Sequence, residues 1–276
     1  IIYIISQGFG YGETGGLGIV GFALIMAGIM NFVSYFWSDK IVLGISGAKP
    51  IQKKDNPQVY RTVENLCIAA GLPLPKIYLI NDSAPNAFAT GRDPKHAAIA
   101  FTSGILEKLN KQELEGVTSH ELSHVGNRDT LLMAVVSVLV GTIALLADFF
   151  LRSIWYGNRD SDNKNSGIFM IIAIVAAILA PIVAMLIQMA VSRRRELLAD
   201  ASGVLLTRYP EGLVSALQKI SSDKEALEVA NRGTAHLYIV NPLKGKAAMG
   251  WFAGLFNTHP PIEARIKALH EMEGKI

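Results

Sequence analysis

Residues 117–127 read VTSHELSHVGN and lie just before an apolar stretch, LLMAVVSVLVGTIALLADFFL, that fills 131–151. His120 and His124 are four residues apart, so on a helix both imidazoles project from one face and can reach a single metal ion. Glu121 lies beside them, where its carboxylate can take a proton from a water on that metal. The segment predicts a helix that carries a hydrolytic metal site at the surface of a membrane.

Three stretches are long enough to cross a bilayer, which takes about 20 apolar residues. They are 17–37, 131–151 and 167–191, and Asp148 is the one charged residue within them. The opening IIYII is interpreted as the tail of a fourth, truncated span. The chain has 276 residues, of which 50% are hydrophobic and 18% charged, with a mean hydropathy of +0.32. This composition excludes a disordered chain and argues against a purely soluble enzyme.

Lys and Arg are distributed unevenly between the connections, which indicates the orientation of the spans. Residues 6–16 contain neither, whereas Lys40 and four further basic residues follow the first span and Arg193–Arg195 follow the last. Both polar regions are therefore expected on the cytoplasmic face of a plasma or inner membrane, where they can form one domain. The expected parts are N-terminal membrane segments at 1–37, the first half of the domain at 38–130, a transmembrane hairpin at 131–191, and the second half at 192–276.

The polar regions show the patterns of a mainly helical α+β fold with a small sheet. Helices are expected over 58–71, 111–127, 194–207 and from Pro260 to about residue 272, and strands over 76–80, 97–101, 86–89 and 238–240.

A catalytic zinc needs a third protein ligand and leaves one position for water. The four remaining His residues are candidates, and Glu196 in RRRELLAD is another. A helical hairpin brings its outer ends together, so Glu196 after the last span is expected at the depth of His124. From spacing alone, an ordinary charged helix at the membrane surface explains Glu196 equally well. Asp200, four residues further on, shares the helix face of Glu196 and can orient a ligating His, and Asn127 is assigned the same supporting role.

Four features follow one another along the chain: HELSH at 120–124, two apolar spans, ELLAD at 196–200, and Thr-His-Pro-Pro at 258–261. Together they resemble the HtpX-type heat-shock proteases of the M48 family of integral-membrane zinc metalloproteases. The resemblance covers nearly the whole chain. Members of that family usually have four spans, whereas this chain shows three and a remnant, which is interpreted as truncation.

The resemblance implies a zincin-like domain with Zn²⁺ as cofactor. Its ligands would be His120, His124 and Glu196, and Glu121 would be the general base. His259 would lie near the developing oxyanion, although a helix-capping position before two prolines is an alternative from the residues alone.

The resemblance also suggests substrates, which would be misfolded or damaged membrane proteins with exposed cytoplasmic segments. Asn86, Ala87 and Phe88 resemble the edge strand by which thermolysin-like enzymes hold an extended peptide. A strand between turns that binds nothing is the alternative for this segment. The partners are then substrates and the lipid bilayer, without nucleic acid, since the net charge is only +3. The oligomeric state stays open.

Three other functions compete with this interpretation. A prenyl-protein (CAAX-type) endoprotease also uses an H-E-x-x-H segment, but it typically has more spans than this chain. A membrane scaffold with a structural zinc would need a fourth protein ligand, often Cys, and Cys67 is the single cysteine. A transporter would carry charges inside its spans, where only Asp148 is found.

Overall fold

The computed structural model describes residues 39–157, 166–223 and 260–275, together with isolated residues at 25, 28, 29, 32, 35–37, 225, 227, 238 and 239. In chain order the elements are β1 (Lys49–Pro50), α3 (Pro57–Ala70), β2 (Lys76–Ile80), β3 (Ala87–Thr90), η1 (Pro94–His96), β4 (Ala98–Thr102), α4 (Ser103–Lys108), α5 (Lys111–Gly126), α6 (Asp129–Gly157), α7 (Ser166–Thr207), α8 (Pro210–Ser222) and α10 (Ile262–His270). The mainly helical α+β fold is confirmed, whereas the strand expected at 238–240 is a bend at 238 and 239.

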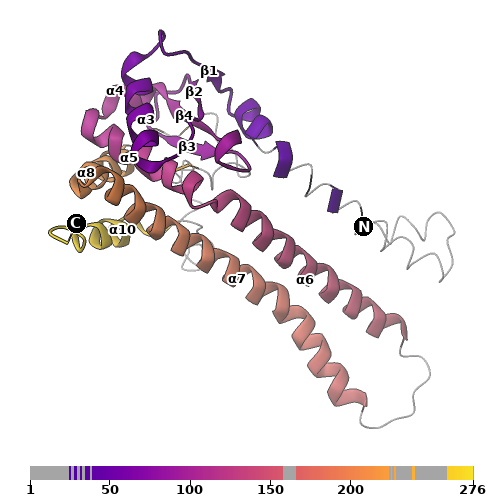
Figure 1. Ribbon diagram of the computed structural model, residues 1–276. Helices are drawn as coiled ribbons and strands as arrows, with labels where there is room; N and C mark the ends of the chain where they lie inside the picture. Colours follow the sequence, from indigo (N-terminus) through magenta and orange to yellow (C-terminus); the bar gives the residue numbers. More distant parts are fainter. Residues whose placement is uncertain are drawn as a thin grey trace.

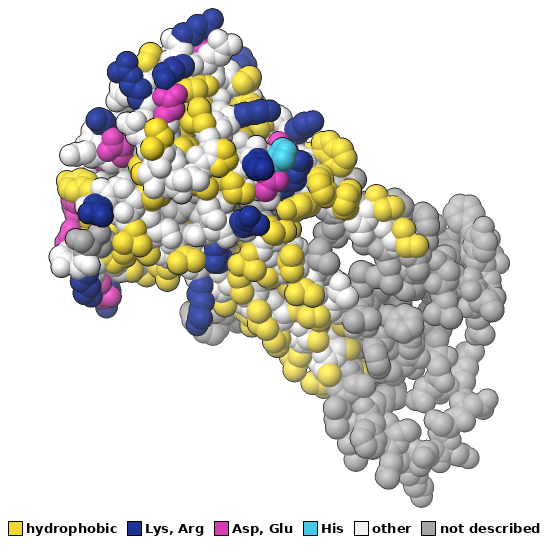
Figure 2. Space-filling model, in the orientation of Figure 1, with side chains coloured by type: hydrophobic (Ala, Val, Ile, Leu, Met, Phe, Trp, Pro, Cys, Tyr) yellow, Lys and Arg dark blue, Asp and Glu magenta, His cyan; other side chains and the backbone are white. Residues whose placement is uncertain are grey.

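Helices α6 and α7 form a hairpin that extends away from the sheet and the shorter helices (Figure 1). Leu139, Ile178 and Ile187 are among its exposed apolar side chains. Much of the coloured surface of the hairpin is apolar (Figure 2). By length and composition, Ile174–Thr207 can cross a membrane by itself, and α5 with the first half of α6 passes the same test as a pair bent by 56°. The expected spans 131–151 and 167–191 lie within α6 and α7, and most of 17–37 lies outside the described residues.

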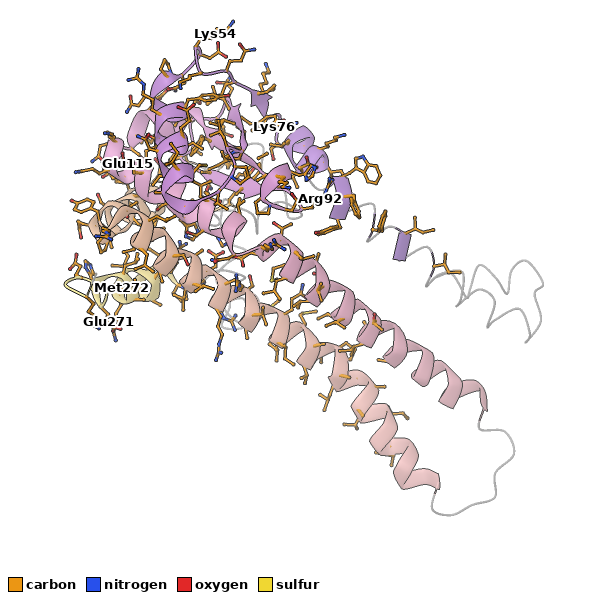
Figure 3. The ribbon with its side chains drawn as sticks, in the orientation of Figure 1. Lys54, Lys76, Arg92, Glu115, Glu271 and Met272 are labelled. Carbon is orange, nitrogen blue, oxygen red and sulfur yellow. The ribbon has the colours of Figure 1, made fainter. Side chains whose placement is uncertain are left out.

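The sheet has four strands in the order β1-β2-β4-β3. Strands β2 and β4 are parallel, and β3 pairs antiparallel with β4, so β3 is an edge strand. One face of the sheet packs on α3, α5, α8 and α10 through the larger apolar core, which includes Val63, Phe101 and Leu217. Charged side chains such as Lys54 and Lys76 lie at the periphery of this domain (Figure 3).

Helix α5 is fixed at its start, which positions the HELSH segment. Asn110 caps the helix and accepts a hydrogen bond from the Glu113 backbone, while the Glu113 side chain accepts one from the Asn110 backbone. The buried Glu113 also accepts hydrogen bonds from Ser215 Oγ at 2.6 Å and Lys219 Nζ at 2.8 Å, both on α8. These contacts hold α5 against α8 in the interior of the domain.

Helices α5 and α7 approach closely at the HELSH segment. A Cβ atom on Gly203 would lie 3.0 Å from the His120 backbone nitrogen, so a glycine allows the two helices to meet there. Beyond Gly126 the chain turns through Arg128, whose φ of 55° is left-handed, and continues as α6. This turn places the start of α6 beside the end of α5.

Candidate metal centre

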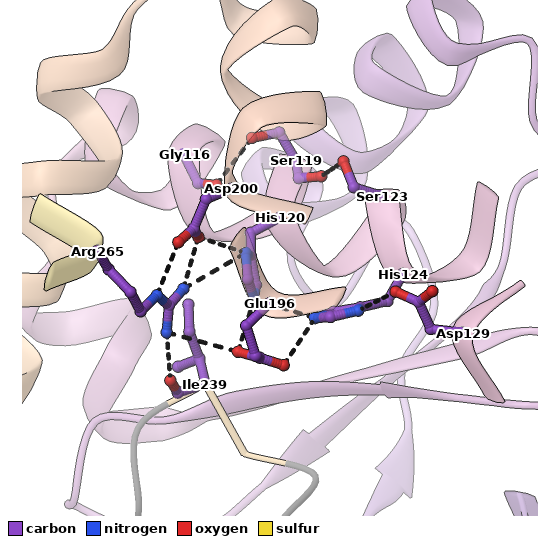
Figure 4. A network of polar contacts seen from close by, with 10 residues as sticks. All are labelled: Gly116, Ser119, His120, Ser123, His124, Asp129, Glu196, Asp200, Ile239 and Arg265. Carbon is purple, nitrogen blue, oxygen red and sulfur yellow. Dashed lines mark hydrogen bonds and ion pairs between the residues drawn. The ribbon is translucent and has the colours of Figure 1, made fainter. Parts of the chain in front are cut away.

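Three ligand atoms converge between α5 and α7, as the sequence predicts. The Nε2 atoms of His120 and His124 are 3.1 Å apart. The Glu196 carboxylate lies 3.4 Å from His124 Nε2 and 3.9 Å from His120 Nε2 (Figure 4). Metal–ligand bonds of about 2.0–2.2 Å place tetrahedral ligand atoms about 3.3–3.6 Å apart. The spacing therefore fits one ion bound by all three side chains.

The other ring nitrogen of each imidazole is bound to a carboxylate. His120 Nδ1 donates to Asp200 at 2.8 Å, and His124 Nδ1 donates to Asp129 at 2.6 Å. These hydrogen bonds fix the tautomers, so both Nε2 atoms present lone pairs to each other and to the Glu196 carboxylate. Three converging acceptors repel one another unless a cation lies among them, so the donor set fits a metal ion.

Arg265 on α10 is fully buried beside this site. Its Nε and Nη2 atoms donate to the two Asp200 oxygens at 2.8 and 2.6 Å, and its Nη1 lies 3.7 Å from the Glu196 carboxylate. Nη1 also donates to the Ile239 carbonyl at 3.0 Å. The 3.4 Å between Arg265 Nη2 and His120 Nδ1 is a packing contact, because both atoms are donors once Nδ1 is bound to Asp200. The guanidinium therefore holds Asp200 against His120.

The sequence analysis did not identify Arg265, although a signal was present. Ile262, Ile266 and Leu269 follow helical spacing, and Arg265 lies on the same buried face of α10. A buried arginine on an apolar helix face requires a carboxylate partner.

Asp129 and Arg195 form a second ion pair beside the ligands, and the sequence analysis gave neither a role in the site. Arg195 directly precedes Glu196 on α7, and its Nη2 also donates to the Asn127 carbonyl at 3.1 Å. The Asn127 backbone carbonyl thus contacts Arg195, whereas the supporting role expected of this residue stays a prediction. Its side-chain nitrogen is buried and has no hydrogen-bond partner among the described residues.

Glu121 is buried next to the ligands. Burial raises the pKa of its carboxyl group, the neighbouring His120 and His124 oppose that shift, and the net pKa lies above the usual value. The Ala89 backbone on β3 lies near the carboxylate and partly offsets the rise in its pKa. A carboxylate with a raised pKa beside a metal site has the properties of a general base.

The residues expected to bind substrate lie on or beside β3. The Asn86 side chain is buried and accepts a hydrogen bond from the Ala87 backbone, and the Phe88 ring is buried against Tyr238. The Phe88 side chain therefore lies in the core, and its backbone is paired with Ala100 on β4. The Ala87 carbonyl accepts a hydrogen bond from the Ile239 backbone at 3.1 Å. His259 lies outside the described residues.

Similarity to known proteins agrees with this geometry. The relative called "Protease HtpX homolog" from Tropheryma whipplei (strain Twist) is 46% identical over 274 residues, covering 99% of this chain and 92% of its own length. The protein of the same description from Dictyoglomus thermophilum is 48% identical over 262 residues, covering 95% of this chain and 84% of its own.

A solved structure shares the fold. The crystal structure of S. mikatae Ste24p matches with a TM-score of 0.59 at 18% identity, covering 91% of this chain and 58% of that chain. The sequence profile of Peptidase family M48 matches residues 53–273, which include all three candidate ligands. The chain therefore belongs to peptidase family M48 and is a membrane-associated metalloprotease.

Proposed function

We propose that the protein is a zinc endopeptidase that is anchored by several membrane spans and cleaves exposed cytoplasmic segments of misfolded or damaged membrane proteins. The observation that carries the zinc site is the convergence of two Nε2 lone pairs and one carboxylate between α5 and α7. Two imidazoles and one carboxylate are a ligand set of catalytic zinc, which keeps a further position for water.

In this mechanism the chain's own residues handle the protons. A zinc ion bound by His120, His124 and Glu196 would polarise the scissile carbonyl and make a water acidic enough to lose a proton near neutral pH. Glu121 takes that proton and then delivers it to the leaving amine.

The edge of β3 supports the proposal that an extended peptide lies beside the site. The Ala87 carbonyl on this edge accepts one hydrogen bond, from Ile239, and keeps a second lone pair, and Ala89 lies near Glu121. A peptide added to this edge would run past the general base. Asn86 and Phe88 would support the strand from the interior.

The position of the hairpin supports a site at the membrane surface. Asp129, the first residue of α6, contacts His124, and Glu196 lies on α7 beyond the apolar part of that helix. Arg193–Arg195 follow the apolar part directly, which favours the cytoplasmic side for this end of the hairpin.

The test is metal content and cleavage of casein by the detergent-solubilised protein. We expect one zinc per chain in the wild type and chelator-sensitive cleavage. Glu196→Ala should lose zinc and activity together, whereas Glu121→Gln should keep zinc and lose at least about 100-fold in cleavage rate. Glu115→Gln on the outer face of α5 is the matched control and should behave like the wild type. A Glu121→Gln protein that cleaves casein at the wild-type rate would contradict the mechanism.

Faster cleavage of a prenylated peptide than of its unmodified form would favour the CAAX-type alternative.

A further inference from the structure

We infer that Asp129 and Arg195 are positioning residues. They hold the metal ligands in place at the end of the α6–α7 hairpin that joins the domain, where α6 begins at Asp129. The inference rests on the proposed zinc site. Asp129 binds the ring of His124, Arg195 binds Asp129, and Arg195 directly precedes the ligand Glu196. Ligands from the two helices are thus joined through a path of side chains that does not include the metal.

Of the two histidine ligands, His124 is the one whose ring orientation depends more on a hydrogen-bonding partner, because it is less enclosed by the surrounding helices. Its side chain is 21% exposed, compared with 1% for His120. The His120 ring is enclosed between α5, α7 and α10, whereas His124 lies in the last turn of α5, just before the chain bends into α6. The contact from His124 Nδ1 to Asp129 Oδ2, at 2.6 Å, therefore decides where its Nε2 atom points.

Asp129 uses its two oxygen atoms for two different partners. Oδ2 accepts from His124, and Oδ1 accepts from Arg195. The side chain of Asp129 is 8% exposed, so its charge needs a partner in place. Arg195 supplies that partner and in addition binds the Asn127 carbonyl in the turn between α5 and α6. The Arg195 guanidinium therefore binds both the Asp129 carboxylate, which orients His124, and the turn that precedes Asp129.

The adjacent arginine provides a contrast within the same helix. Arg194 is exposed, as expected of a basic residue at a membrane surface, whereas Arg195 is 21% exposed and directed at Asp129. The charge pattern of Arg193–Arg195 alone cannot distinguish the two roles. The geometry assigns the positioning role to Arg195, whereas Arg194 is an exposed basic residue.

Because α6 and α7 carry the two members of the ion pair, a change in the separation of these helices at the domain would move His124 relative to Glu196. A polar contact further along the hairpin, from Gln188 Nε2 to Ser137 Oγ at 3.0 Å, also joins α6 and α7. The Asp129–Arg195 ion pair thus links α6 and α7 directly beside the ligands His124 and Glu196.

The experiment measures zinc affinity by competition with a chelator and the visible spectrum of the Co²⁺-substituted, full-length protein in detergent. Asp129→Asn and Arg195→Gln should each weaken zinc binding about 10–100-fold. Each should also change the Co²⁺ spectrum, which a remote structural effect would leave unaltered. The double variant should lose less than the sum of the two single losses, since both residues act through His124. Arg194→Gln, with the same charge change one residue away, should match the wild type.

Arg195→Lys keeps the charge and is the variant to use if Arg195→Gln does not fold, and it should recover part of the lost affinity. If Asp129→Asn and Arg195→Gln bind zinc and display the Co²⁺ spectrum as Arg194→Gln does, the inference is wrong while the zinc site stands. If the wild type binds no zinc, or Glu196→Ala binds it as tightly as the wild type, the proposed function itself fails.

Discussion

The two histidine ligands are supported in the same way in two different surroundings. His120 is bound by Asp200, which is paired with Arg265, and all three side chains are buried in the domain. His124 is bound by Asp129, which is paired with Arg195, and this group lies at the partly exposed mouth of the hairpin. One arrangement of imidazole, carboxylate and guanidinium therefore serves both ligands, while the burial of the two groups differs. Substitutions on the His120 side should therefore reduce stability and zinc affinity more than matching substitutions on the His124 side.

The largest effect is expected from removing Arg265. Arg265→Met leaves the buried Asp200 carboxylate without its guanidinium, which should cost about 3–5 kcal/mol of unfolding free energy. Arg195→Met on the exposed side should cost clearly less, because the Arg195 and His124 side chains are each 21% exposed, so that water can reach Asp129 once the guanidinium is removed. Denaturant unfolding of the metal-free proteins in one detergent measures both. Equal losses for the two variants would remove the distinction between the buried and the exposed side.

The next effect concerns metal affinity. Asp200→Asn keeps the shape of the side chain but weakens the acceptor for His120 Nδ1–H, and it should lower zinc affinity about 10–100-fold. We expect its loss to equal or exceed that of Asp129→Asn, because no water can replace the lost acceptor at the buried position. Chelator competition ranks the two variants. A larger loss in Asp129→Asn would reverse the comparison.

A smaller effect is expected from the close approach of α5 and α7. A methyl group at Gly203 would meet the His120 backbone nitrogen and Ser119 Oγ, each at 3.0 Å. Gly203→Ala should therefore destabilise the protein by about 1–3 kcal/mol and perturb the His120 side of the site. Gly141→Ala on α6, where nothing lies within 4 Å of the added atom, is the control. Unfolding curves that place Gly203→Ala level with Gly141→Ala would show that the helices can separate freely.

The smallest effect lies away from both ligand groups, at Glu113. Burial alone would raise its pKa, but hydrogen bonds from Lys219, Ser215 and the Asn110 backbone outweigh burial and lower it. A folded-state pKa below the unfolded value of about 4.3 stabilises the protein above that pH, and this contribution disappears as the pH falls through the folded-state pKa.

Glu113→Gln should therefore reduce, by about 1 kcal/mol, the unfolding free energy that the protein loses as the pH falls into the acid range. It should leave metal affinity unchanged. Unfolding measured as a function of pH, with Glu115→Gln as the control, checks the prediction. A change in zinc affinity in Glu113→Gln would mean that the start of α5 is coupled to the metal site.

Much of the site could be predicted because its signals are local. The spacing of His120 and His124 lies within one helix, whereas hairpin topology leaves Glu196 and an ordinary charged helix as equal alternatives, and the family resemblance favours Glu196 as a ligand. The edge strand was expected at 86–89 and is found one residue later, at Ala87–Thr90.

The supporting arginines could not be assigned in the same way. Arg265 acts through the packing of α10 on α7, and Arg195 acts through the left-handed turn at Arg128 that brings Asp129 back to His124. These contacts join residues about 65 positions apart, and no local periodicity encodes them.

The most direct test of the central claim is X-ray absorption spectroscopy at the zinc edge of the loaded wild type, compared with Glu196→Ala. The account predicts four nitrogen or oxygen neighbours at about 2.0–2.2 Å, of which two show imidazole scattering. In Glu196→Ala the carboxylate contribution should be lost together with most of the bound zinc. A sulfur neighbour, a third imidazole, or an unchanged spectrum in Glu196→Ala would contradict the account.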